Sequence, residues 1–214
     1  MSFWERLELT NRETWPFIPG LAVMLVLSAI MLAIADKGDY VLALNDWHGS
    51  TWDMVFRYGT WLGDGVFWMV ILIALLFYNW RQALMFGIAT SVNGLLTGLL
   101  KDSYNLPRPK NFFDEGTLQF VEHVDVHGMR SFPSGHTSMA FLGFFVLAFL
   151  LRRRPWASAF CLFMAAQVGL SRIYLSQHFL IDVFTGAALG TLIAWIVISW
   201  LRRYKFFGVP EEKG

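Results

Sequence analysis

Residues 171–182 gather the side-chain types of nucleophilic catalysis in one short segment, which reads SRIYLSQHFLID. His178 and Asp182 are four residues apart, so on a helix they would lie one turn apart on the same face. A carboxylate beside an imidazole fixes which ring nitrogen stays unprotonated, which makes His178 a candidate nucleophile and Asp182 its orienting partner. In soluble proteins a His–Asp pair at the same spacing is usually a surface ion pair or a helix cap. The location of the pair in the fold must therefore decide between a structural and a catalytic role.

The elements that position this pair are those of an integral membrane protein. The chain of 214 residues is 56% hydrophobic and 17% aromatic, and only 15% of its residues are charged, whereas soluble domains carry about 25%. Several runs of about 20 residues hold few or no charges, which is enough for a transmembrane helix. The net charge of +1 gives no reason to expect a nucleic-acid partner. The single Cys161 excludes an intrachain disulfide and a cysteine-based metal site.

The apolar runs predict an all-α fold, a polytopic six-transmembrane-helix bundle formed by one membrane-embedded domain over residues 1–214. The first run lacks a basic start and a small-residue cleavage site, so we expect a retained span rather than a signal peptide. The six predicted spans are Phe17–Ala35, Gly65–Tyr78, Ala83–Leu100, His136–Leu151, Trp156–Leu170 and Phe179–Leu201. The second and third spans are joined by a tight turn at Asn79, Trp80 and Arg81.

The segments between the spans have distinct compositions. Residues 1–16 mix aromatic and charged side chains and predict an interfacial segment. Residues 36–64 and 101–135 form the two outer loops, the first of them amphipathic and suited to the bilayer surface. The basic turn Arg152-Arg153-Arg154 marks the cytoplasmic side and predicts that both termini, with the tail 202–214, are cytoplasmic.

This topology brings three charged clusters to one face of the membrane, whichever way the chain is inserted. Lys101 and Arg108 follow the third span, Ser134, Gly135 and His136 open the fourth, and residues 172–182 join the fifth to the sixth. Ser134 is a good N-cap, and the free N–H groups of a helix start carry partial positive charge. Gly135 lets a ligand approach the backbone closely. The cluster composition therefore predicts a phosphate site.

Each side chain has a role if the ligand is a phosphate. Arg108 and Arg172 offer planar forks for pairs of oxygen atoms, and Lys101 adds a compact charge. Such cations neutralise the charge that develops during phosphoryl transfer. His178, held by Asp182, would attack phosphorus. The second histidine, His136, would protonate the departing oxygen.

The spacing of these residues resembles the three-part signature of the type 2 phosphatidic acid phosphatase superfamily. The three parts are Lys101-x6-Arg108-Pro109, Pro133-Ser134-Gly135-His136 and Ser171-Arg172-x5-His178-x3-Asp182. The resemblance covers about residues 60–201. It implies His178 as the nucleophile, Asp182 as its orienting partner and His136 as the general acid. It also implies a phosphate held by Lys101, Arg108, Ser134, Gly135 and Arg172, with neither metal nor cofactor. Many members carry a proline two residues after the nucleophile, where this chain has Leu180.

The resemblance implies a phosphatase that hydrolyses the phosphate monoester or diphosphate of a membrane lipid through a phosphohistidine. Because the site lies at headgroup depth, the lipid tail can stay in the bilayer while its phosphate reaches the charges. The compact chain suggests a bacterial inner membrane with the site on the outer, periplasmic face. Nothing in the sequence chooses among phosphatidic acid, phosphatidylglycerol phosphate, undecaprenyl diphosphate and lipid A as substrate, and the oligomeric state stays open.

Three alternatives compete with this interpretation. A phosphotransferase that passes the phosphohistidine to a second acceptor fits the sequence equally well. A transporter would carry ionisable groups near mid-span, whereas these lie at one boundary. His123 and His127, with Glu122 and Asp125, lack the ligand set of a defined zinc site, so the pattern favours a polar outer loop that also covers the phosphate pocket. His48 is expected at the membrane interface, and Asn93 is expected to face a neighbouring helix.

Overall fold

A computed structural model describes residues 1–152 and 154–204 of the chain. Arg153 of the basic turn and residues 205–214 of the predicted tail lie outside the described residues. Within the described ranges the regular structure is helical. The elements are α1 (Phe3–Glu13), α2 (Phe17–Ile34), α3 (Asp39–Asn45), α4 (Ser50–Gly59), η1 (Thr60–Gly63), α5 (Gly65–Tyr104), α6 (Pro109–Phe112), α7 (Gly135–Leu150), α8 (Pro155–Tyr174) and α9 (Leu180–Leu201).

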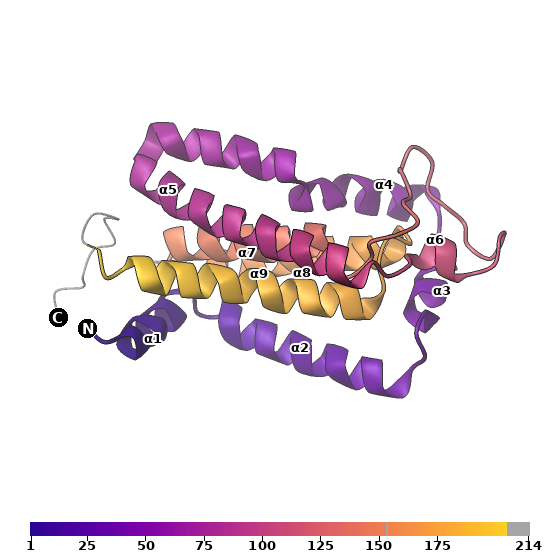
Figure 1. The fold of residues 1–214 in the computed structure, drawn as a ribbon, viewed down its shortest axis with the longest axis horizontal. Helices are drawn as coiled ribbons and strands as arrows, with labels where there is room; N and C mark the ends of the chain where they lie inside the picture. Colours follow the sequence, from indigo (N-terminus) through magenta and orange to yellow (C-terminus); the bar gives the residue numbers. More distant parts are fainter. Residues whose placement is uncertain (153, 205–214) are drawn as a thin grey trace.

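The long helices run side by side along the longest axis of the molecule (Figure 1). The short helices α3, α4 and α6 lie at one end of the bundle, and α1 lies at the other end (Figure 1). In the described part of the chain, four helical segments are long and apolar enough to cross a membrane, namely α2, α5 with its extension to Phe112, α8 and α9. The shorter helix α7 is also apolar. These lengths confirm an all-helical integral membrane protein, while the count of six crossings stays a prediction.

The predicted turn between the second and third spans is a sharp bend inside α5. Asn79 has φ −156° and ψ 92°, which is not helical, and the two halves of α5 fold back on each other (Figure 1). The Asn79 Oδ1 atom accepts hydrogen bonds from the N–H groups of Arg81 at 3.2 Å and Gln82 at 3.3 Å. The side chain therefore caps the second half of the helix, as an N-cap residue does.

Two predicted span ends fall four residues short of the helix ends in the structure. The helix of the third span continues past Leu100 to Tyr104, so Lys101 lies in the last turn of α5 and not at the start of a loop. The fifth span continues past Leu170 to Tyr174, which places Arg172 on α8. The first outer loop is largely helical, because α3, α4 and η1 occupy most of residues 36–64. The predicted interfacial segment is the helix α1, whose N-terminus is capped by Ser2 and Glu5.

Helix α7 lies at the centre of the bundle, and most of its side chains are buried. Its backbone lies close to that of α9. A Cβ atom on Gly186 would collide with the carbonyl oxygen of Ser134, and one on Gly190 with that of Ser138. On its other side, the Ser138 hydroxyl donates to Asn93 Oδ1 of α5 at 2.5 Å, so Asn93 faces a neighbouring helix as predicted. Small and polar residues thus let α5 and α9 pack closely against the first turns of α7.

Candidate active site

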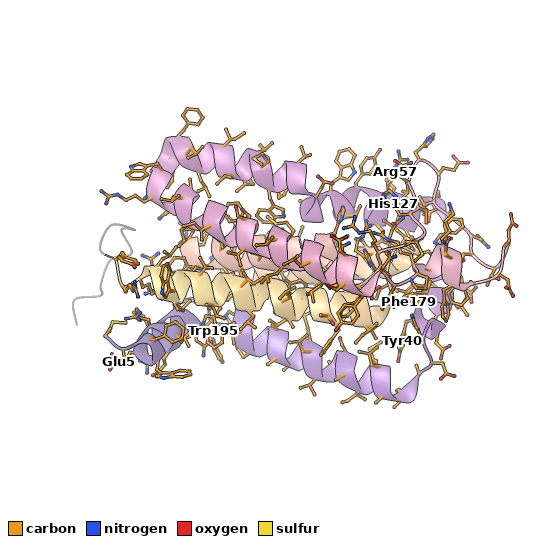
Figure 2. The ribbon with its side chains drawn as sticks, viewed as in Figure 1. Glu5, Tyr40, Arg57, His127, Phe179 and Trp195 are labelled. Atoms are coloured by element: carbon orange, nitrogen blue, oxygen red, sulfur yellow. The ribbon has the colours of Figure 1, made fainter. Side chains whose placement is uncertain are left out.

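The three charged clusters meet at the end of the bundle that carries α3, α4 and α6. Side chains rich in nitrogen and oxygen gather there, around the labelled Phe179 and His127 (Figure 2). A Cβ atom on Gly135 would lie 3.6 Å from Lys101 Cε and 3.8 Å from Nζ. The backbone N–H of Ser134 donates to the carbonyl oxygen of Asp182 at 3.1 Å. The predicted convergence of separate helix ends is therefore present.

His178 lies just before α9 and not on it. Phe179 is the N-cap residue and the helix begins at Leu180, so the expectation that His178 and Asp182 share one helical face is wrong. The two side chains still meet, with His178 Nδ1 3.4 Å from Asp182 Oδ2. They meet because Asp182, in the first turn, folds back to accept the N–H of Phe179 at 3.0 Å.

Ser131 is a third member of the His178–Asp182 group, and it was not predicted from the sequence. Its hydroxyl donates to Asp182 Oδ2 at 2.5 Å and lies 3.5 Å from His178 Nδ1. The three side chains are almost fully buried. Ser131 lies in the long loop before α7 and belongs to none of the three motifs, so only the folded loop brings it here. The carboxylate is thereby held by two donors while it faces the imidazole.

The surroundings of His178 favour its neutral form. Burial lowers the pKa of His178 well below its ordinary value, and the positive charges of Arg172, Arg108 and Lys101 lower it further. An imidazole that donates its Nδ1–H to a carboxylate leaves Nε2 with a free lone pair. The site therefore holds an unprotonated ring nitrogen at neutral pH.

Two buried guanidinium groups flank the imidazole. Arg108 donates from Nη1 to Gln177 Oε1 at 2.9 Å and from Nε to the carbonyl oxygen of Met129 at 3.0 Å. Arg172 donates from Nη1 to the Thr60 hydroxyl at 2.8 Å. Within the described part of the chain, the buried Nε of Arg172 has no hydrogen-bond partner. Because unpaired buried donors are costly, this N–H is suited to bind an anion.

The start of α7 has the predicted geometry. Ser134 is the N-cap, and its Oγ accepts from the Thr137 N–H at 3.4 Å and from the Thr137 hydroxyl at 2.8 Å. His136 follows in the first turn, and its Nε2 lies 3.6 Å from Asp64 Oδ2. Asp64 lies outside the three motifs. Its position beside His136 was not predicted.

The remaining histidines lie outside the cluster. The His48 ring is 4.7 Å from the ring of Tyr174, and its Nε2 is 3.2 Å from that residue's carbonyl oxygen, so it packs on the bundle end. Among the described residues, no group of three or more His, Cys, Asp or Glu side chains is placed to hold a metal ion. The outer loop that carries His123 and His127 does contact the site, because Gln177 Nε2 donates to the carbonyl oxygen of Asp125 at 3.0 Å.

Two of the curated proteins that the chain resembles are named as lipid phosphatases. The chain is 31% identical over 163 residues to "Probable lipid phosphate phosphatase 4" of Arabidopsis thaliana, covering 64% of this chain and 51% of the relative. It is 33% identical over 120 residues to "Lipid A 1-phosphatase" of Rhizobium johnstonii, covering 56% of this chain and 46% of the relative. The chain thus spans about half the length of these curated relatives.

Two solved structures share the fold. The crystal structure of Aquifex aeolicus LpxE superposes with a TM-score of 0.68 at 27% identity, covering 77% of this chain and 96% of that one. The PAP2 type phosphatidylglycerolphosphate phosphatase of Bacillus subtilis superposes with a TM-score of 0.64 at 24% identity, covering 87% and 96%. The family model described as "PAP2 superfamily" matches residues 80–206. This match covers more than half of the chain and all three motifs, so the chain belongs to the PAP2 superfamily, that of the type 2 phosphatidic acid phosphatases.

Proposed function

We propose that this protein is a phosphatase that hydrolyses the phosphate monoester or diphosphate of a membrane lipid, without a metal, through a phosphohistidine. The observation that carries the proposal is the buried, neutral imidazole of His178, which lies 3.4 Å from Asp182 and beside the guanidinium groups of Arg108 and Arg172. The relatives named as lipid phosphate phosphatase and lipid A 1-phosphatase support the substrate class.

In the first step, the lone pair of His178 Nε2 attacks phosphorus while the bond from phosphorus to the lipid oxygen breaks. His136 gives its proton to that oxygen, which leaves as the lipid alcohol or, from a diphosphate, as the lipid monophosphate. Lys101, Arg108 and Arg172 bind the equatorial oxygens, where charge is spread in the transition state. The N–H groups that follow Ser134 and Gly135 add partial positive charge.

In the second step, water attacks the phosphohistidine and inorganic phosphate departs. His136, now neutral, takes the proton of the attacking water, which returns it to its starting state. Asp182 stabilises the positive charge that develops on His178 as the bond to phosphorus forms, as the buried aspartate does in a serine protease. Each proton that leaves one group is accepted by another, so the cycle is balanced.

The location of the site supports a lipid substrate. The charges lie at one end of a bundle of apolar helices, so a lipid tail can remain in the bilayer while its phosphate enters the cluster (Figures 1 and 2). We propose a single domain over residues 1–214, with the site on the outer face of a bacterial inner membrane and both termini in the cytoplasm. The two ends of the described chain lie near each other, at the end opposite to the site (Figure 1).

The test is to trap the intermediate. Purified protein in detergent with EDTA is mixed with 32P-labelled lipid phosphate and quenched in alkali, in which phosphohistidine is stable. We expect label on the wild-type chain and none on His178→Ala, whose fold is checked by its melting temperature. A strict requirement for a divalent metal, or label that persists in His178→Ala, would contradict the proposal. A phosphate-release screen over lipid phosphates and diphosphates then identifies the substrate.

A further inference from the structure

The segment Thr60–Asp64 contacts two residues of the site from outside its motifs and outside the residues 80–206 that the family model matches. At one end, the Thr60 hydroxyl accepts the hydrogen bond from Arg172. At the other end, the two oxygens of Asp64 point to different partners. Oδ1 accepts the N–H of Val66 at 2.7 Å and caps α5, whereas Oδ2 lies 3.6 Å from Nε2 of His136.

The packing around Asp64 fixes this arrangement. A Cβ atom on Gly63 would lie 2.8 Å from the carbonyl oxygen of His136, so this backbone presses directly against the start of α7. One turn into α5, Trp68 is 1% exposed and donates from Nε1 to the carbonyl oxygen of Leu62 at 2.8 Å. Its ring meets Phe144 of α7 edge to face at 5.1 Å. The start of α5 is therefore anchored to the helix that carries His136, and Asp64 approaches His136 because the backbone holds it there.

The charges around His136 show why a carboxylate is needed. The groups that face it from the neighbouring elements are Arg172, His178, Lys101 and Arg108, each of them cationic or neutral. A general acid must carry its proton when the lipid oxygen departs, and burial of the ring and the three cations all oppose that protonated state. The negative charge of a substrate phosphate would offset part of this repulsion. Asp64 is the carboxylate that the described structure places beside the ring.

We propose that Asp64 is a positioning residue for the general acid. Its carboxylate accepts from Nε2–H of the His136 imidazolium and leaves Nδ1–H to protonate the lipid oxygen. This inference rests on the proposed function. It follows that the effect of Asp64 through His136 is felt only where the leaving group needs a proton, which is the case for an alkoxide and not for nitrophenolate. Any effect of its charge on Arg172 falls on both substrates alike.

The test separates the charge of Asp64 from its capping role. Asn and Ser cap helices as well as Asp does, so Asp64→Asn and Asp64→Ser remove the charge and keep α5 capped, whereas Asp64→Ala removes both. Asp46→Asn, at an exposed carboxylate at the end of α3, controls for the loss of one negative charge. The value of kcat/KM is measured for a lipid phosphate and for p-nitrophenyl phosphate, because this quantity reports on the departure of the leaving group.

Both capped variants should lose about two- to fivefold more kcat/KM with the lipid phosphate than with the aryl phosphate, the size expected of a half-exposed ion pair. With the lipid phosphate, the pH above which kcat falls, which reports on the enzyme–substrate complex, should move down by up to about half a unit. Equal losses on both substrates, or an unchanged pH profile, would overturn the inference. A defect confined to Asp64→Ala would make Asp64 a cap alone. Turnover that survives in His178→Ala would instead refute the phosphohistidine mechanism, whatever Asp64 does.

Discussion

Asp182→Asn should lower kcat by about seventyfold and leave KM for the lipid almost unchanged, because the carboxylate acts on the charge of the transition state. Asp182 Oδ2 lies 3.4 Å from His178 Nδ1, and both side chains are 2% exposed. With an effective dielectric constant of about 20, two unit charges at that distance attract by about 5 kcal/mol. If about half a charge develops on the imidazole, the loss is about 2.5 kcal/mol, which corresponds to about seventyfold.

Ser131→Ala is the matched control, because its hydroxyl donates to the same oxygen of Asp182 but carries no charge. The variant keeps the carboxylate and the hydrogen bond from the Phe179 N–H. It should lose about 1.5–3 kcal/mol of unfolding free energy, as expected for a hydrogen bond to a charged group. Its kcat should fall by less than about tenfold, because the tautomer of His178 is still set by Asp182.

The assay is phosphate release in detergent micelles, with kcat and KM determined separately and the fold checked by thermal melting. Asp182→Asn with kcat within about threefold of the wild type would refute the electrostatic reasoning. So would a Ser131→Ala variant whose kcat falls as far as that of Asp182→Asn, since the hydroxyl would then matter as much as the charge.

Three further predictions follow from the same geometry. Because the pKa of His178 is lowered in the folded chain, protonation of this nucleophile should not reduce kcat/KM as pH falls from 7 to about 6, where a free histidine protonates. The free energy of unfolding should fall as pH drops through about 6.5, because only the unfolded chain takes up that proton. Melting curves of the wild type and His178→Gln at pH 7 and about pH 6 test this. Arg172→Lys should raise KM at least about tenfold in the phosphate-release assay, because an ammonium cannot replace a planar fork that binds both Thr60 and an anion; an unchanged KM would exclude Arg172 as a phosphate ligand. Gly186→Ala should cost about 1–3 kcal/mol in denaturation, because the new methyl group would meet the Ser134 carbonyl oxygen at 2.7 Å; full stability would show that the helices can separate.

The convergence of the site was predictable from the sequence because two strong constraints agree. Apolar runs fix how often the chain crosses the bundle, and the motif residues stand at the ends of those runs. Any arrangement of such helices brings Lys101, His136 and Arg172 to the same end. The bend at Asn79 was also predictable, since polar and basic residues interrupt an apolar run there.

The contacts that orient the site were not predictable, because they join residues far apart in the sequence. Ser131 reaches Asp182 across 51 positions, and Thr60 reaches Arg172 across 112. Neither a serine in a loop nor a threonine at the start of a short helix such as η1 carries a sequence signal for such a contact. The prediction that His178 and Asp182 share one helical face was wrong for a different reason. A spacing of four residues suits a helical face, but it equally suits a first-turn carboxylate that folds back over the N-cap, and Asp182 does the latter.

Backbone contacts between the starts of α7 and α9 determine how the two histidines are placed relative to each other. Ser134 donates its N–H to the carbonyl oxygen of Asp182 at 3.1 Å, so the starts of α7 and α9 are joined through the backbone. One turn later, Gly186 lies against the carbonyl oxygen of Ser134. His136 and His178 each lie within four residues of this junction, His136 in the first turn of α7 and His178 just before α9. Their relative position is therefore set by main-chain contacts between two packed helices, which hold it more firmly than side chains on a free loop would.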